Sequence, residues 1–191
     1  MSSIFSISDS LKTLLSRGHS YTMQLKDPTE ADQSNAVSVW LYQIQADEFS
    51  RNNAPPVLNK AASNGNEVGV AKQRRSAVPP LGVNLFYLVT PMTGNVESDH
   101  EVLGRMLLTI HESPTLRVQQ SELGEDELIR ISLPADPLEE RLHLWDSLKT
   151  KPYRLSFICL LRTARLFTSN VIEEAPVLNL SSAPLLEFPK I

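Results

Sequence analysis

The sequence predicts an α+β fold, with a mixed or antiparallel sheet of about four to five strands and about three helices packed on one face, plus extended arms. Two observations support this prediction. The spacing of apolar residues alternates along the chain in the order helix, strand, strand, helix, strand, helix, strand. The chain also has 13 prolines against 7 glycines. Several of these prolines stand in two stretches that have no helical or strand-like periodicity.

Three segments have the spacing and the end signals of helices. The first covers residues 4–15, after a capping Ser2 or Ser3 and before Gly18. The second opens at a capping box of Ser98 and Glu101 and ends before Pro114, and the third begins at Asp136 and Pro137, with Glu139 two residues on. Their apolar faces consist of Ile4, Ile7, Leu11, Leu14 and Leu15, of Leu103, Met106, Leu107 and Ile110, and of Leu138, Leu142, Trp145 and Leu148.

Four segments are typical of strands, at residues 37–46, 84–90, 128–133 and 153–167, because they are rich in β-branched and aromatic residues. The first and the last are apolar on both faces, and such strands need cover on both sides of a sheet. Three short helices are too few to cover both faces. We therefore expect the arms or another subunit to cover the second face, which favours an oligomer.

Two stretches predict arms rather than packed elements. Residues 52–80 are polar, with a proline pair near each end and an Asn-Gly turn, and they indicate a long loop. Residues 168–191 carry Pro176, Pro184 and Pro189 among apolar residues, which excludes a helix and favours an extended arm. We therefore expect a single domain over residues 1–167 that contains the long loop, followed by a C-terminal arm over 168–191.

Composition excludes several classes of protein. The net charge is −4, which argues against sequence-specific binding of nucleic acid, because such proteins concentrate Lys and Arg. With one cysteine, Cys159, the chain can form neither a disulfide framework nor a Cys-based zinc site. The longest apolar run, FICLL, is far shorter than the roughly 18 residues of a membrane-spanning helix. We expect a soluble protein from a reducing compartment, without membrane insertion.

No motif predicts an enzyme. On one helix, His100 and His111 would lie roughly 16 Å apart, too far to share a metal ion. Cys159 stands in an apolar strand, where burial makes a thiol inert. No Gly-rich phosphate loop and no GxSxG motif occurs. We therefore predict no catalytic, metal-binding or cofactor-binding residues and no cofactor.

Basic side chains are the candidates for an interface. Lys72, Arg74 and Arg75 form a short basic cluster in the polar loop, which could contact an acidic protein surface. Arg162 and Arg165 lie late in the last strand, where they form salt bridges or reach an interface. The acidic run at Glu122, Glu125, Asp126 and Glu127 is interpreted as a solvated turn.

Four stretches, taken in order, are similar to one family: LYQIQADEFSRN (41–52), PPLGVNLFYLVTP (79–91), DHEVLGRMLLTIHESPTL (99–116) and LHLWDSLKTKPYRLSF (142–157). Together they resemble the N-terminal domain of the tube-terminating cap subunits of extracellular contractile injection systems. These phage-tail-like particles include antifeeding prophages and virulence cassettes. The resemblance spans about residues 4–167, and its most specific parts are Arg51-Asn52 after a strand and His-x-x-Leu-Gly at a helix start.

The resemblance implies a tail-terminator-like fold and a structural role. Such a subunit forms a homohexameric ring on the end of the inner tube and stops its polymerisation, so its partners would be other copies of itself, the inner-tube protein and, as a further partner, the sheath protein. It would assemble in the cytoplasm and enter a particle that is released or anchored to a membrane. Arg51 and Asn52 would stabilise a turn or contact a subunit. The alternatives are a phage tail-completion or neck connector protein, and a small-molecule enzyme or binding protein.

Overall fold

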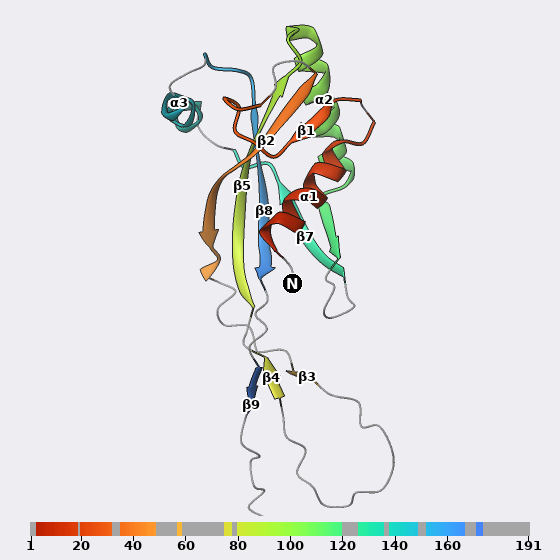
Figure 1. The fold of residues 1–191 in the computed structure, drawn as a ribbon, viewed down its shortest axis with the longest axis vertical. Coiled ribbons are helices and arrows are strands. Elements are labelled where there is room, and N and C mark those ends of the chain that lie inside the picture. The colour runs from red at the N-terminus through yellow and green to blue at the C-terminus, as the bar shows by residue number, and fades with distance from the viewer. Residues whose placement is uncertain are drawn as a thin grey trace, which may run out of the picture. The chain divides into compact units, whose positions relative to one another are not determined.

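A computed structural model describes residues 3–18, 20–31, 35–48, 57–58, 75–77, 80–119, 126–135, 138–148, 152–166 and 171–173. The chain divides into two compact units. The first unit comprises Met1–Asn53 and Pro80–Phe167, and the second comprises Ala54–Pro79 and Thr168–Ile191. In the described residues, the first unit holds three helices and a six-stranded sheet, and the second holds a three-stranded sheet (Figure 1).

The six-stranded sheet has the strand order β1-β2-β5-β8-β7-β6. Its strands are β1 (Thr22–Gln24), β2 (Ala36–Ala46), β5 (Leu81–Met92), β6 (Thr115–Gln119), β7 (Asp126–Ser132) and β8 (Phe157–Leu166). β1 runs parallel to β2, and every other pair of neighbours is antiparallel. The predicted α+β class with a mixed sheet is confirmed. The extra strands, which were not predicted, are the short strands β1 and β6, of three and five residues.

The three helices are α1 (Ile4–Leu15), α2 (Val96–Glu112) and α3 (Leu138–Ser147). α1 begins as predicted, because the Ser6 N–H donates to Ser3 Oγ at 3.1 Å, and Gly18 follows its end with φ +81°. The predicted start of α2 at Ser98 is wrong. Asn95 is the N-cap, and its Oδ1 accepts a hydrogen bond from the Glu97 N–H at 3.0 Å.

α1 and α2 pack on one face of the sheet, here called the inner face. Their buried side chains share a core with inner-facing residues of the strands. α1 contacts both edge strands, β1 and β6, so the sheet curls around it (Figure 1). This core includes Ile7, Leu11, Leu14, Leu15, Val39, Leu85, Tyr87, Val102, Met106, Ile110, Leu116, Ile129, Cys159 and Leu161.

α3 lies on the opposite, outer face, and not on one face with the other two helices as expected. Trp145 packs there against Leu88 and Ile158. Among the described residues of α3 only Trp145 is buried, whereas Leu138 and Leu142 of the predicted apolar stripe are 56% and 40% exposed. Aromatic residues on the outer side of β2 and β5 supply the rest of this smaller cluster, so α3 partly covers the second face that the sequence left open.

A bulge in β8 holds a threonine in a left-handed conformation. Thr163 has φ +57°, which is unfavourable for a β-branched residue. Two contacts compensate. The Thr163 N–H donates to Asn84 Oδ1 at 3.0 Å, and Thr163 Oγ1 donates to Asp47 Oδ2 at 2.9 Å. Asn84 therefore fixes the geometry where β8 shifts its register against β5.

We expect Asn84→Ala to lower the free energy of unfolding by about 1–3 kcal/mol, because it leaves the Thr163 N–H without its acceptor in a strained bulge. Urea unfolding followed by circular dichroism measures this change. Gln45→Ala is the matched control, because Gln45 is exposed and is the cross-strand neighbour of Asn84. Equal losses in the two variants would contradict the assignment.

The second unit has a small antiparallel sheet in the order β3-β4-β9. Its strands are β3 (Val57–Leu58), β4 (Arg75–Ala77) and β9 (Val171–Glu173). β4 pairs with both of the others. The long loop and the C-terminal stretch therefore pair with each other through these strands. The domain boundaries expected at residues 52–80 and 168–191 stay a prediction, and most of both stretches lies outside the described residues.

Candidate interaction surfaces

The interface residues predicted from the sequence have different outcomes. Arg51, Asn52, Lys72 and Arg74 lie outside the described residues, and Arg75 begins β4. Arg162 is exposed, and its Nε donates to Ser132 Oγ at 3.1 Å. Its neighbour Arg165 is also exposed, and its backbone N–H donates to Glu127 Oε1 at 2.8 Å. The structure thus places both arginines at the surface of β8, and their role in an interface stays a prediction.

The groups considered for chemistry lie apart. His100 and His111 are exposed at the two ends of α2. Cys159 is buried, and burial raises the pKa of its thiol to about 12. Within the described part of the chain, no group of three or more His, Cys, Asp or Glu side chains is placed to hold a metal ion. The helices described here include none long and apolar enough to span a membrane.

β6 is an edge strand with an unpaired outer side. The Ile131 N–H donates to the Pro114 carbonyl at 2.8 Å, which fixes how the hydrogen bonds alternate between β6 and β7. By this alternation the N–H and C=O groups of Thr115, Arg117 and Gln119 point away from β7. Among the described residues no strand pairs with them on that side. β6 can therefore accept another strand.

A groove of about 570 Å³ runs between α1 and this edge of β6. One wall is helical and the other is the open side of a strand, the arrangement that receives an extended segment by β-augmentation. The lining side chains from α1 and the turn after it are Phe5, Ser6, Asp9, Ser10, Thr13, Leu14 and Arg17. Those from β6 and from Ser113, just before it, are Ser113, Thr115, Leu116, Arg117, Val118 and Gln119.

β2 is open over most of its length. β1 pairs with it at residues 36–38, and among the described residues no strand follows along 39–46 on that side. The Asp47 N–H donates to the Gly82 carbonyl at 2.9 Å, which fixes the alternation of hydrogen bonds between β2 and β5. By this alternation the N–H and C=O groups of Ile44 and Ala46 point away from β5, toward the open edge of the sheet. A hollow of about 310 Å³ adjoins β2 near Phe5, and another of about 370 Å³ separates β2 from α3.

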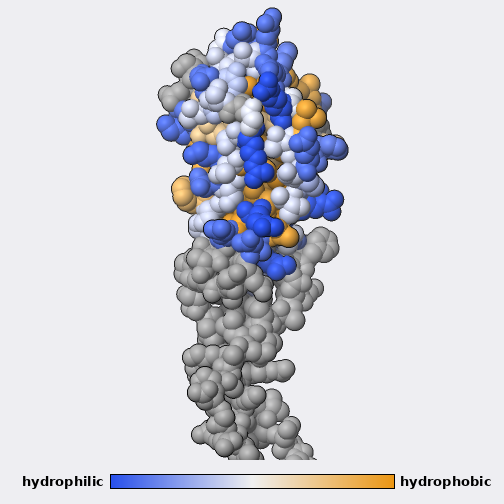
Figure 2. All heavy atoms as spheres, turned by 90° about the vertical axis from the view of Figure 1, so that its right-hand side faces the viewer, coloured by the Kyte–Doolittle hydropathy of each residue, from blue (hydrophilic) through white to orange (hydrophobic). Residues whose placement is uncertain are grey.

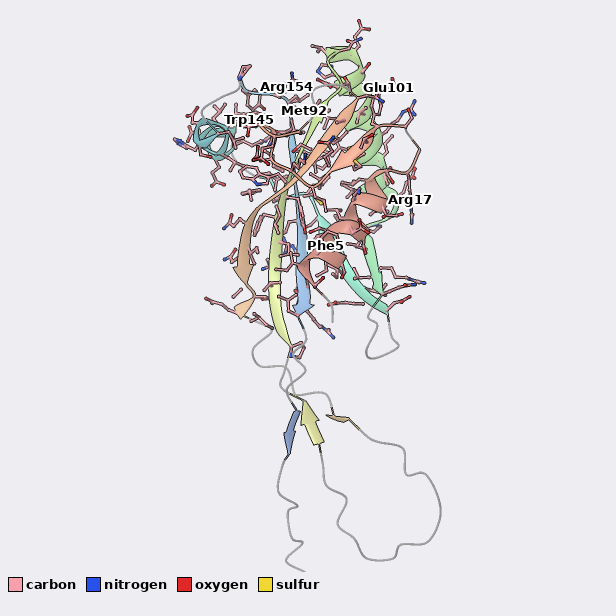
Figure 3. The ribbon with its side chains drawn as sticks, viewed as in Figure 1. Phe5, Arg17, Met92, Glu101, Trp145 and Arg154 are labelled. Atoms are coloured by element: carbon pink, nitrogen blue, oxygen red, sulfur yellow. The ribbon has the colours of Figure 1, made fainter. Side chains whose placement is uncertain are left out.

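Apolar side chains are exposed beside both open edges. Phe5 is 71% exposed at the start of α1, and it lines both the α1–β6 groove and the hollow next to β2 (Figure 3). Ile44 on β2 is 51% exposed. Figure 2 shows the side of the molecule at the right of Figure 1, where hydrophilic side chains dominate and apolar ones lie between them. Open strand edges next to exposed apolar side chains are typical of an interface.

Three arginines form a patch on the outer face of β6, β7 and β8. Arg130 lies directly opposite Arg162, and Arg117 lies opposite Leu128, which is 64% exposed. Like charges opposite each other are unfavourable, so an acidic partner would stabilise the patch. Sequence analysis missed Arg117 and Arg130. The apolar–polar alternation in TLRVQ and LIRIS was the available signal, because it predicts exposed arginines between buried apolar residues.

Comparisons with known proteins identify a family from the sequence and a shared fold from solved structures. The model of the Pvc16 N-terminal domain matches residues 6–179. No curated protein sequence matches the chain. Among solved structures, the sheath/tube terminator of an extracellular contractile injection system, PVC, in its extended state has a TM-score of 0.66 and 16% identity, over 100% of this chain and 66% of that one. The tube-terminating cap of the anti-feeding prophage has a TM-score of 0.61 and 22% identity, over 95% of this chain and 62% of that one.

These likenesses agree with the sequence resemblance. The chain spans slightly less than two thirds of the length of both solved relatives. The matched residues 6–179 include all four sequence stretches that carry the resemblance, together with every described strand and nearly all of α1. The resemblance inferred from those stretches is therefore confirmed. The chain belongs to the family of Pvc16 N-terminal domains.

Proposed function

We propose that this chain is a structural cap that sits on the end of the inner tube of a contractile injection system and terminates tube polymerisation. The observation that carries the proposal is the match of the fold, over nearly the whole chain, to a sheath/tube terminator and to a tube-terminating cap. The surfaces support it, because the described residues offer open strand edges and exposed apolar side chains, which are features of an assembly subunit.

The proposed partners are further copies of this chain, the inner-tube protein and the sheath protein. The family resemblance implies six copies, and a cap on a tube with cyclic symmetry would form a closed ring through heterologous contacts. The sheath is included because one solved relative is a terminator of both sheath and tube. In this role the chain assembles in the cytoplasm, enters the particle and catalyses no reaction.

The test is deletion of the gene in cells that produce the particles. We expect tubes of aberrant length in electron micrographs, because nothing would stop the addition of tube subunits, and normal length on complementation with the wild-type chain. An epitope tag on the chain should label one end of each tube. An unchanged distribution of tube lengths in the deletion strain would overturn the proposal.

A further inference from the structure

We propose that neighbouring copies join edge to edge, with the open part of β2 (residues 39–46) of one copy adding as a strand to β6 of the next. The interface surface is thus the α1–β6 groove, and its occupant is a second copy of this chain. This inference rests on the proposed function, because it describes how the ring closes. It names a main-chain contact that neither the family nor the likeness to solved structures specifies.

The sheet topology sets the direction of this pairing. From β2 through β5, β8 and β7 to β6 there are four antiparallel steps. β2 and β6 therefore run in the same direction at the two sides of one sheet. Copies related by rotation about a ring axis keep the same orientation. β2 of one copy would thus meet β6 of the next as a parallel strand, and the two sheets would become continuous.

The inner faces of the two edges match in chemistry. Ile44 pairs with Leu85 and Ala46 with Val83, whose side chains belong to the inner core, so Ile44 and Ala46 also face inward. In an adjoining copy these apolar side chains would enter the groove beside α1. Phe5 and Leu14 line that groove. Ile44 and Phe5 are both exposed in the single chain, and burying them against each other would remove apolar surface from water and favour the pairing.

The outer faces match in charge. Arg117 on β6 lies on the outer face. Gln43 and Gln45 on β2 lie there too, because their cross-strand partners Phe86 and Asn84 alternate along β5 with residues of the inner core. Glu140 of α3 lines the hollow next to Gln43. An added β2 would bring its own α3, and hence Glu140, over the outer side of β6 near Arg117. In the single chain Arg117 has an exposed partner, Asp126 at 3.6 Å, which gives a weak ion pair that solvent screens.

A disulfide between copies tests this pairing. Gln45→Cys and Arg117→Cys are introduced into one chain, because both side chains are exposed on the outer face. Three strands separate the two positions within a copy, so no internal disulfide is expected. Native Cys159 is fully buried and does not interfere. A second pair, Gln43→Cys with Arg117→Cys, covers a register two residues away.

Mild oxidation is carried out on the purified full-length chain at high concentration and on particles from cells that carry only the variant. We expect one of the two pairs to convert most of the chain into a ladder of linked copies at multiples of 21.3 kDa. Each single-cysteine variant should stop at a dimer. The matched control is Gln45→Cys with Leu128→Cys, because Leu128 is exposed on the same face but one strand further from the edge, beyond the reach of a disulfide.

Three outcomes overturn the inference: no ladder from either edge pair, a ladder equal to that of the Leu128 control, or normal capped particles that contain no linked copies. In the last case the cap proposal stands, and another segment, such as a strand of the tube protein, occupies the groove. A ladder in the purified chain combined with unchanged tube length in the deletion strain would support the edge pairing and overturn the cap proposal. The two failures are therefore distinguishable.

Discussion

Trp145→Ala is expected to lower the free energy of unfolding by about 3–5 kcal/mol, the usual cost of removing a large buried aromatic side chain. Trp145 is 3% exposed and packs against Leu88 and Ile158 on the outer face. Its ring meets Tyr153 edge-on at 5.8 Å, and its Nε1 donates to Ser156 Oγ at 3.4 Å. Leu144 packs partly buried against the same cluster, and Arg141 Nη1 donates to the Ser156 carbonyl at 3.1 Å, but Trp145 is the one buried side chain among the described residues of α3 and therefore its main anchor on the sheet (Figure 3).

Two variants separate packing from other effects. Trp145→Phe keeps most of the apolar contact and loses the hydrogen bond. We expect the lost hydrogen bond to lower the free energy of unfolding by about 1 kcal/mol, in addition to the cost of the smaller side chain. Leu142→Ala lies on the same helix but is 40% exposed, and we expect a loss of under about 1 kcal/mol. Urea unfolding followed by far-ultraviolet circular dichroism is the measurement. If Trp145→Ala and Leu142→Ala cost the same, Trp145 does not anchor α3.

The position of α3 also matters for assembly. Glu140, His143 and Leu144 form one wall of the hollow beside β2. A chain whose α3 detaches would keep the inner core, which contains no α3 residue, while it loses the acidic side chain proposed to meet Arg117 of a neighbour. Such a chain would stay folded and lose only the edge pairing, which the disulfide ladder would detect.

Local signals determined what could be predicted from the sequence. α1 has a capping serine, a regular apolar face and a glycine after its end, so its limits follow from about 15 neighbouring residues. β1 and β6 are different, because strands of three and five residues form only when a longer strand is beside them. The start of α2 was missed because two caps competed, and Asn95 has both acidic residues of the first turn after it.

The candidate surfaces were harder to predict for a topological reason. Whether β2 or β6 has an open side depends on which strands are neighbours in the sheet. The order of strands along the chain does not determine these neighbours. Arg162 was identified from its place in an apolar strand. Arg130 of β7 lies opposite it, and Arg117 of β6 joins the same face of the sheet, only after folding. A sequence can thus indicate which side chains are exposed, whereas the patch they form depends on register.

Alkaline pH is expected to remove several kcal/mol of stability between about pH 9 and pH 12. Burial raises the pKa of Cys159 from 9.0 to about 12. Burial also raises the pKa of Tyr87 from 10.0 to about 12, although its hydrogen bond with Ser8 acts in the opposite direction. Both groups are neutral when folded and lose protons more easily when unfolded. Their contribution is complete below the unfolded pKa and is lost as the pH rises through the folded pKa.

The two groups can be separated because their unfolded pKa values differ. A tenfold difference in proton affinity corresponds to about 1.4 kcal/mol, so the thiol is the larger contributor. Cys159→Ala should move the onset of the stability loss from about pH 9 to about pH 10, where Tyr87 begins to ionise in the unfolded chain. Urea midpoints measured from pH 7 to 12 give this curve, with the variant's own value at pH 7 as its baseline. The same onset in both chains would show that Cys159 does not ionise on unfolding in this range. A shifted onset would show that the thiol is held neutral by the core that positions β8 between the two open edges of the sheet.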